Sequence, residues 1–304
     1  MQKIGDSANR YLCLTVAISG FYLSFVPSDF ADVINLGGAA AYAVVAVGGS
    51  PAIQSEFKLY QSDTVINGNV AEGPYTTLGH NIDATVNGRW DYDVTDDNPL
   101  VDYPGSNIPS GGFHQIGLSG VSADARAAAA FGMTLAPTQT FSSLTNGQTI
   151  VGDGGLNVIR VTGDSAISGG STTFTLQGSA TDSFVFQFTS LTTAGHDILD
   201  LSGVTMNITG VNTNNIYWDL NGLGGDITIK AGATVYGNFL APDRNLTSDH
   251  GNVFGRLIAG GSGSLLNIHS SSQITVPEPG VATFLLLGMA LLGLRLVRFR
   301  NTTS

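Results

Sequence analysis

The sequence predicts an all-β fold in which short strands are stacked into a β-solenoid, and three observations support this. Glycine accounts for 40 of the 304 residues but follows no collagen-like triplet period. Short runs rich in β-branched and aromatic residues alternate with clusters of Gly, Asn and Asp, which is typical of strands joined by tight corners. Two pairs of segments also repeat at spacings near 20 residues, about one turn of a solenoid.

The repeats define the expected unit of the fold. Thr234–Ala241 recurs as Asn252–Ala259, an offset of 18 residues. Earlier in the chain, Thr64–Ala71 is echoed by Thr85–Trp90 at an offset of 21. Each unit is a short strand, a glycine corner and a second short strand. Such a unit buries its apolar side chains only when the next unit stacks on it.

Other segments have the length and composition of strands. They are Ser171–Leu176, Phe184–Phe188, Val204–Ile208, Ile216–Trp218 and Ile227–Lys230. In the second of these, period-two alternation places Phe184, Phe186 and Phe188 on one side of the strand. We expect these rings to face the core and Gln187 to face outward or toward a helix. Alternating strand and helix units are missing, which argues against Rossmann and TIM-barrel folds.

One helix is expected in the middle of the chain. Ala123–Phe131 is almost entirely alanine, and Pro137 follows it as a stop. Ser122 is a suitable N-cap, and Asp124 is favourable in the first turn. Because the side chains are small, the helix can approach a sheet closely. We therefore expect it to dock alongside the solenoid.

Residues 1–31 have the pattern of a secretory signal peptide. Lys3 and Arg10 form a basic start, and Tyr11–Val26 is apolar and uncharged. Cleavage after Ala31 would leave residues 32–276 as the exported solenoid domain. A buried N-terminal helix is the alternative interpretation.

Residues 277–304 have the pattern of a sorting tail. Pro277, Glu278 and Pro279 precede the uncharged apolar segment Val281–Leu294. Three arginines follow it: Arg295, Arg298 and Arg300. This predicts a transmembrane helix with a basic cytoplasmic end. The order resembles the PEP-CTERM tail, which implies an exosortase-type processing enzyme as partner and only transient membrane anchoring; an ordinary anchor is the alternative.

Composition argues against several other functions. The chain has 12 Lys and Arg against 23 Asp and Glu, for a net charge of −11, so a nucleic-acid partner is not expected. The single cysteine, Cys13, lies in the apolar run near the start, so no disulfide framework or zinc knuckle is expected. No cofactor is predicted, apart from calcium as considered below.

Several segments together resemble known exported proteins. They are Leu36–Val47, the alanine-rich helix, Asp182–Phe188, Asn215–Trp218, Phe239–Pro242 and Asn252–Ala259. Their order is similar to that in the choice-of-anchor A group and in the ice-binding-protein-like adhesive family. The resemblance implies a right-handed β-helix with one helix docked alongside, and a role at a surface or in an extracellular matrix.

An acidic segment is the candidate metal site. Within Trp90–Asp102 lie five aspartates: Asp91, Asp93, Asp96, Asp97 and Asp102. Counted as an EF-hand loop, the segment has Asp96 where glycine is needed and Asp102 where glutamate is needed, so an EF-hand is excluded. A looser calcium loop and a solvated acidic loop both remain open.

Catalytic motifs are weak. The five histidines lack zinc-ligand spacing, and GxSxG and Walker motifs are missing. The glycines of Gly152–Gly155 precede a strand rather than a helix, which is not the context of a dinucleotide site. His196, Asp197 and Asp200 are compatible with a glycosidase site on a β-helix, although aspartates next to glycines are also common at solenoid corners.

Threonine is the candidate binding residue, because the resembled ice-binding proteins use flat threonine-rich faces. Thr173, Thr175 and Thr228 lie in expected strands, but ordinary β-propensity also explains threonine there. We therefore expect an exported, non-catalytic surface or matrix protein, associated with adhesion and exopolysaccharide, at the cell envelope or outside the cell after both ends are processed. An antifreeze-like ice-binding protein and a polysaccharide-degrading β-helix enzyme are the alternatives.

Overall fold

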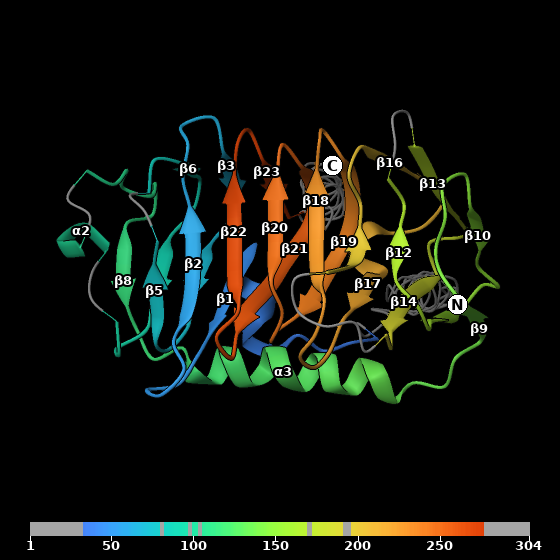
Figure 1. The fold of residues 1–304 in the computed structure, drawn as a ribbon, viewed down its shortest axis with the longest axis horizontal. Helices are drawn as coiled ribbons and strands as arrows, with labels where there is room; N and C mark the ends of the chain where they lie inside the picture. The colour runs from blue at the N-terminus through green and yellow to red at the C-terminus, as the bar shows by residue number, and fades with distance from the viewer. Residues whose placement is uncertain are drawn as a thin grey trace, which may run out of the picture. The chain divides into compact units, whose positions relative to one another are not determined.

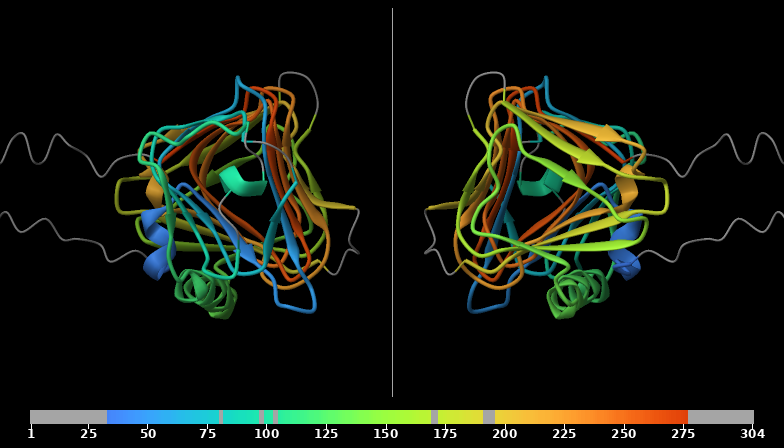
Figure 2. Two further views of the ribbon diagram at one scale, coloured as in Figure 1. Left: turned by 90° about the vertical axis from the view of Figure 1, so that its left-hand side faces the viewer. Right: turned by 90° about the vertical axis from the view of Figure 1, so that its right-hand side faces the viewer.

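The computed structural model describes residues 33–79, 82–96, 99–102, 105–168, 172–190 and 196–276. They form a solenoid of parallel strands wound around one core, with a long helix, α3, along its side (Figure 1). Viewed end-on, the solenoid is three-sided, and α3 lies outside one corner (Figure 2). The expected signal peptide and sorting tail lie outside the described residues. No helix in the described ranges has the length and apolar content needed to cross a membrane.

Two parallel sheets form the three sides of the solenoid, which we call faces a, b and c; faces a and b belong to one 16-stranded sheet and face c is a 7-stranded sheet. Face a contains, in spatial order, β8 (Phe113–Gln115), β7 (Trp90–Tyr92), β4 (Val70–Glu72), β1 (Val44–Gly48), β21 (Asn252–Gly261), β19 (Thr234–Ala241), β17 (Ile216–Asp219), β14 (Ser183–Phe188), β11 (Leu156–Val161) and β9 (Gln139–Phe141). Face b contains β10 (Thr149–Val151), β13 (Thr172–Gln177), β16 (Val204–Thr209), the first halves of β19 and β21, β23 (Gln273–Thr275), β3 (Val65–Asn67) and β6 (Thr85–Val86). Face c contains β12 (Ser165–Ala166), β15 (Asp197–Asp200), β18 (Asp226–Lys230), β20 (Leu246–Asp249), β22 (Leu265–His269), β2 (Ser55–Leu59) and β5 (Thr76–Leu78).

The coils are not stacked in the order of the sequence. The chain enters in the middle of the solenoid at β1 and winds to one end at β8. Helix α3 (Ser119–Thr134) then runs along the side to the opposite end at β9, and the remaining coils wind back toward the middle. There β21, β22 and β23 pair with β1, β2 and β3, as in the register of Val44 with Leu257. The first and last coils are therefore neighbours.

The repeats match the stacking of the coils, with one correction. Thr234–Ala241 pairs with Asn252–Ala259 residue for residue, which confirms the offset of 18. The expected offset of 21 is wrong, because Ile66 pairs with Val86 and Val70 with Trp90, an offset of 20. The observed register places Ile66 and Val86 together in the core. The pairs Thr64-Val65 and Thr85-Val86 are alike in sequence, but they are displaced by one residue in the sheet.

Glycine sets the corner between faces b and a. Strands β19 and β21 turn there at Gly237 and Gly255, where φ is +113° and +157°. A Cβ atom on Gly255 would lie 1.9 Å from the carbonyl oxygen of Gly237 in the coil beside it. The repeated glycine is therefore needed for close stacking as well as for its backbone conformation.

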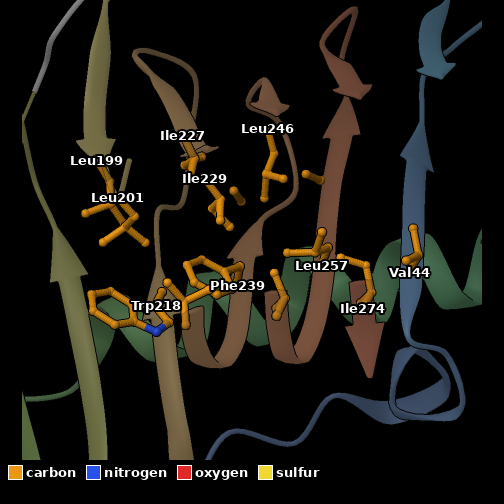
Figure 3. Packing of buried hydrophobic residues seen from close by; sticks show 14 of the residues in the cluster. Val44, Leu199, Leu201, Trp218, Ile227, Ile229, Phe239, Leu246, Leu257 and Ile274 are labelled. Atoms are coloured by element: carbon orange, nitrogen blue, oxygen red, sulfur yellow. The ribbon is translucent and has the colours of Figure 1, made fainter. Parts of the chain in front are cut away.

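Aromatic rings from successive coils stack inside the solenoid. Trp218 lies between Phe186 and Phe239, with ring centroids 4.4 Å and 5.6 Å apart and nearly parallel planes. Figure 3 shows Trp218 and Phe239 in this core, below aliphatic side chains from face c. Phe184 and Phe188 also belong to the core, so the predicted facing of this strand is confirmed.

Gln187, on the opposite side of β14, faces α3 as expected. Its amide nitrogen, Nε2, donates to the carbonyl oxygens of Gly132 and Leu135, both at 2.8 Å. The oxygen Oε1 accepts from Arg160. The side chain is fully buried, so it ties the sheet to the end of the helix.

Helix α3 is docked as predicted, but its start is different. It begins at Ser119, so Ser122 is not the N-cap; its hydroxyl donates to the carbonyl of Val47 in β1 at 2.6 Å. Asp124 accepts from the backbone N–H of Gly38 at 2.7 Å. Both side chains serve tertiary contacts that a local capping rule does not anticipate. Three shorter helices were also not predicted: η1 (Gly37–Ala41), α2 (Pro99–Asp102) and η2 (Thr213–Asn215).

Candidate binding face

Face b presents an open, regular surface built by the pairing of its strands. Inward residues such as Phe174, Val235 and Ile274 belong to the core, so the alternate residues point outward. One outward row follows the pairing across seven strands: Thr173, Thr205, Thr234, Asn252, Gln273, Val65 and Thr85. A second row has two parts: Thr149, Thr175 and Asn207, then Tyr236, Phe254, Thr275 and Asn67. Val151, Gln177 and Thr209 form a third, shorter row.

Among the described residues, no outward strand position of face b carries a charge. This is unusual for a chain with 35 charged residues, 23 of them acidic. Face c differs, because Glu56, Lys58, Lys230 and Asp249 all point outward from its strands. The parallel strands are about 4.8 Å apart, so uncharged groups repeat along face b at a nearly constant spacing.

Two aromatic rings stand in the middle of face b. Tyr236 and Phe254 stack with centroids 5.1 Å apart and planes inclined by 18°. The Phe254 side chain is 37% exposed. Tyr236 is half-buried and packs against the core, whereas more of Phe254 lies at the surface. We call Tyr236 and Phe254 the ring pair.

Beyond the ring pair, polar side chains are held in a fixed order. Asn87 Nδ2 donates to Asn67 Oδ1 at 2.9 Å, and Asn67 Nδ2 donates to Thr275 Oγ1 at 3.0 Å. We call Asn87, Asn67 and Thr275 the amide ladder. Each amide nitrogen carries two N–H groups, and the ladder uses one of them. The other N–H of each asparagine is available at the surface.

The structure separates the three predicted binding threonines. Thr173 and Thr175 both lie on face b, the first exposed and the second half-buried. Thr228 lies on face c, is buried, and donates its hydroxyl to Asp197 Oδ1. It is therefore not part of the same face, because β18 pairs with β15 and β20 rather than with a strand of face b.

The first two aspartates of the acidic segment have structural partners. Asp91 Oδ2 accepts from the Tyr42 hydroxyl at 2.6 Å and lies 2.8 Å from Arg89 Nε. Burial and the bond to Asp91 raise the pKa of Tyr42. Asp93 accepts from the backbone N–H of Leu118 at 2.6 Å. Both carboxylates anchor segments of this end of the solenoid.

The remaining aspartates do not add a metal cluster to the described structure. The backbone carbonyl of Asp96 accepts from Gln115, and Asp97 lies outside the described residues. Asp102 is in α2, but its side chain is not described. Within the described ranges no group of three or more His, Cys, Asp or Glu side chains is placed to hold a metal ion. Calcium binding by this segment stays a prediction.

The candidate catalytic carboxylates also have local partners. Asp197 accepts from Thr228, and Asp200 accepts from the N–H and hydroxyl of Ser202 at 2.9 and 2.6 Å. His196 is exposed. A polar hollow in the described structure lies away from these residues and is lined by Gln61, Ser62, Asp63, Asp83 and Asn107. The geometry therefore gives no support to a glycosidase site at these residues.

Asp182 is a buried carboxylate that sequence reasoning missed, although it lies beside the glycines of Gly152–Gly155. Its oxygens accept from the backbone N–H groups of Gly154 and Ser179 and from Asn157 Nδ2, at 2.7 to 2.9 Å. Burial alone would raise its pKa, but these hydrogen bonds lower the pKa to about 2. Asp182 therefore organises a corner between coils.

Asp219 is a second missed carboxylate, and its surroundings are different. It points outward from β17 beneath α3, next to Gln187, and is fully buried. Neither carboxylate oxygen has a hydrogen-bond partner, and Oδ2 lies against Gly132 of α3. Burial raises the pKa of Asp219 to about 8, and the nearby N–H of Asn221 and guanidinium of Arg244 offset this only in part. In the sequence, Asp219 directly follows the apolar run Ile216–Trp218. A carboxylate at the end of an apolar strand was the signal that could have identified it.

The stacked parallel coils and the docked helix define a class of protein, the parallel β-solenoids with a helix along one side. Comparison with known families then gives the particular one. A family model for the ice-binding-like adhesive domain matches residues 18–269, and the chain belongs to this family. No curated relative matches the sequence.

Solved structures share the fold. An ice-binding protein from the Antarctic ascomycete Antarctomyces psychrotrophicus has 20% identity and a TM-score of 0.53, with 81% of this chain and 98% of that chain covered. An ice-binding protein from an Arctic yeast has 18% identity and a TM-score of 0.53, with 81% and 96% covered. One from an Antarctic biological consortium has 18% identity and a TM-score of 0.51, with 80% and 91% covered. At these identities the likeness concerns the fold alone.

Proposed function

We propose that the protein is an exported, non-catalytic adhesive protein that attaches through face b to a flat, uncharged extracellular material. The observation that carries this proposal is that the outward strand positions of face b, within the described ranges, hold only uncharged residues. An ordered neutral surface offers hydroxyl groups and apolar patches, and face b offers threonine hydroxyls, amides and aromatic edges to meet them. A fixed charge there would have to be desolvated on contact, at a cost that face b avoids.

The test is to place one charge on face b and the same charge on face c. Thr205→Asp changes an exposed residue in the longest outward row, and Thr247→Asp changes an outward residue of β20 on face c. Retention of each protein is measured on ice and on insoluble neutral polysaccharides. We expect Thr205→Asp to lose retention and Thr247→Asp to keep it. Equal retention of both variants, or retention only on ion-exchange matrices, would contradict the proposal.

Ice is a second candidate for the neutral material, and the threonines favour it. Thr149 pairs with Thr175, while Thr173, Thr205 and Thr234 follow one another in the adjacent row. The two solved structures with a TM-score of 0.53 are ice-binding proteins. An ice-recrystallisation assay of the wild-type protein tests this candidate directly. Inhibition that Thr173→Asp removes would support it.

Export and sorting belong to the same proposal. The basic and apolar start, and the Pro277–Pro279 triplet followed by an apolar segment and arginines, support passage across a membrane and processing by an exosortase-type enzyme. Intact-mass measurement of the released protein should give a species that begins near residue 32 and ends near residue 277. A released species that still carries Phe284–Leu292 would contradict the transient anchor.

A further inference from the structure

We propose that the part of face b around the ring pair and the amide ladder is a binding subsite for a neutral polysaccharide chain. This inference rests on the proposed attachment function of face b and names the chemical class of its ligand. Its residues are Tyr236, Phe254, Thr275, Asn67 and Asn87.

The two parts of face b offer different chemistry. On β13 and β16 the outward residues are polar: Thr173, Thr175, Gln177, Thr205, Asn207 and Thr209. On β19 and β21 the stacked rings of Tyr236 and Phe254 occupy outward positions instead. The ring pair therefore interrupts a polar surface with apolar area, against which a polysaccharide chain can pack.

The ring pair suits the apolar side of a sugar. A pyranose ring has C–H groups on its faces and hydroxyl groups at its rim. Phe254 is 37% exposed and supplies apolar surface, while Tyr236 adds a hydroxyl that can donate and accept. The Tyr236 backbone is fixed, because its carbonyl accepts from Trp218 Nε1 at 2.9 Å. The rings therefore stand on a rigid part of the coil.

The amide ladder suits the hydroxyl rim. Asn67 and Asn87 are exposed, and their orientations are set by the hydrogen bonds along the ladder. Each retains one N–H for a ligand oxygen, and Asn87 Oδ1 can accept from a ligand hydroxyl. Thr275 pairs with Phe254 in the sheet, so the ladder begins directly beside the ring pair. Apolar and hydrogen-bonding surfaces thus lie side by side, as in sites that bind small polar ligands.

Charge determines which polysaccharides fit. A uronate or sulfate group would need a cation, and the outward strand positions of face b provide none among the described residues. The whole chain, with a net charge of −11, also repels polyanions. The ligand is therefore neutral. Its binding should change little between low and high salt, because no ion pairs contribute.

The experiment compares wild-type protein with three single variants in pull-down assays. The probes are cellulose, chitin and an insoluble β-1,3-glucan, with an alginate gel as the acidic control. Phe254→Ala removes an exposed ring, and Asn67→Ala removes one step of the ladder. Thr247→Ala, at an outward position of β20 on face c, is the matched control outside the binding face. Thermal unfolding of each variant checks that it is folded.

We expect the wild-type protein to bind cellulose, chitin or the β-1,3-glucan. The affinity should be about the same in roughly 0.1 M and 1 M salt, because salt screens ion pairs and none contributes to this binding. Phe254→Ala should weaken this binding about tenfold, as for a central aromatic contact, and Asn67→Ala by roughly threefold. Thr247→Ala should stay within about twofold of wild type.

Three results would overturn the inference. They are binding to none of the neutral polysaccharides, binding to alginate that salt abolishes, and equal losses in Phe254→Ala and Thr247→Ala. These results leave the proposed attachment function standing as long as Thr205→Asp, but not Thr247→Asp, releases the protein from ice or another neutral surface. Failure of that charge test would remove the attachment function itself.

Discussion

Faces a and b are built from the same coils, and β19 and β21 contribute to both, yet their outer sides have opposite environments. On face a, outward residues such as Val45, Val185 and Leu240 are fully buried, because strands of this face contact α3. On face b, the corresponding outward residues remain at the surface. The comparison shows that the outer side of a coil can either pack against a helix or remain at the surface. Contact with α3 determines which of these environments the outward residues have.

The largest expected difference concerns the stacked rings inside the solenoid. Trp218→Ala or Phe186→Ala removes a ring from the stack and leaves a cavity, so each should lower the free energy of unfolding by roughly 3–5 kcal/mol. Phe254→Ala, on open face b, should cost less than about 1 kcal/mol. Denaturant unfolding measures all three. Similar losses at Phe186 and Phe254 would mean that face b is covered in solution.

The next prediction tests the carboxylate buried beneath α3. The pKa of Asp219 is about 8 in the folded protein, against an ordinary value of 3.8. Between these values the unfolded chain loses the proton while the folded protein keeps it, so stability falls as pH rises from about 4 to 8, by up to about 1.4 kcal/mol per pH unit. Asp219→Asn should remove this contribution.

Thermal unfolding of Asp219→Asn and the wild-type protein across pH 4 to 9 measures the effect. The variant should gain stability over wild type as pH rises, with the difference levelling off above about pH 8. At pH 4 the two proteins should be much closer. A constant difference at every pH would show that Asp219 is hydrated or paired in solution and that α3 does not seal this part of face a.

A smaller effect is expected for the amide that joins face a to α3. Sequence reasoning alone predicts that Gln187→Ala has little effect. The structure changes this expectation, because the substitution removes the amide donor from the carbonyls of Leu135 and Gly132 and should cost about 1–3 kcal/mol. The Gly132 carbonyl would keep only the N–H of Leu135, at 3.3 Å. Gln177→Ala, at an exposed position on face b, is the matched control and should stay within about 0.5 kcal/mol of wild type. Equal melting temperatures for the two variants would contradict the contact.

The smallest stability effect is expected on face b itself. Thr205→Asp changes an exposed side chain and should shift the free energy of unfolding by no more than about 0.5 kcal/mol. Circular dichroism melting measures this. A large loss of stability would mean that reduced attachment reflects unfolding, and an exposed threonine elsewhere on face b would then be needed for the charge test.

Local patterns predicted the parts of the fold that depend on neighbours in the sequence. The alternation in Phe184–Phe188 correctly placed the rings in the core and Gln187 toward the helix, because residues of a strand alternate sides whatever lies around it. The offset of 18 between the last two long strands was correct because a unit with the same pattern of apolar residues and glycine stacks directly on the one before it. The offset of 21 failed because two Thr-Val pairs resemble each other without sharing a register.

The candidate site was only partly within reach of the sequence. Thr173 and Thr175 were identified, and the structure places both on face b. Thr228 was grouped with them because it also lies in a strand, but a strand in isolation does not reveal which of three faces it joins. The ring pair was visible only as aromatic residues at matching places in two repeats. Its exposure depends on the fact that α3, within the described structure, packs on face a and not on face b.

The sequence by itself determined that this chain forms short strands with glycine corners, that successive units stack, and that one alanine-rich helix separates two sets of coils. These features follow from side-chain alternation, backbone conformation and repeat spacing, all of which act over a few residues or between adjacent units. The tertiary structure decided that the first coil pairs with the last, which of the three faces α3 covers, and that Asp219 is buried while face b stays open. Those outcomes depend on contacts between residues as far apart as Val44 and Leu257, and no local pattern encodes such contacts.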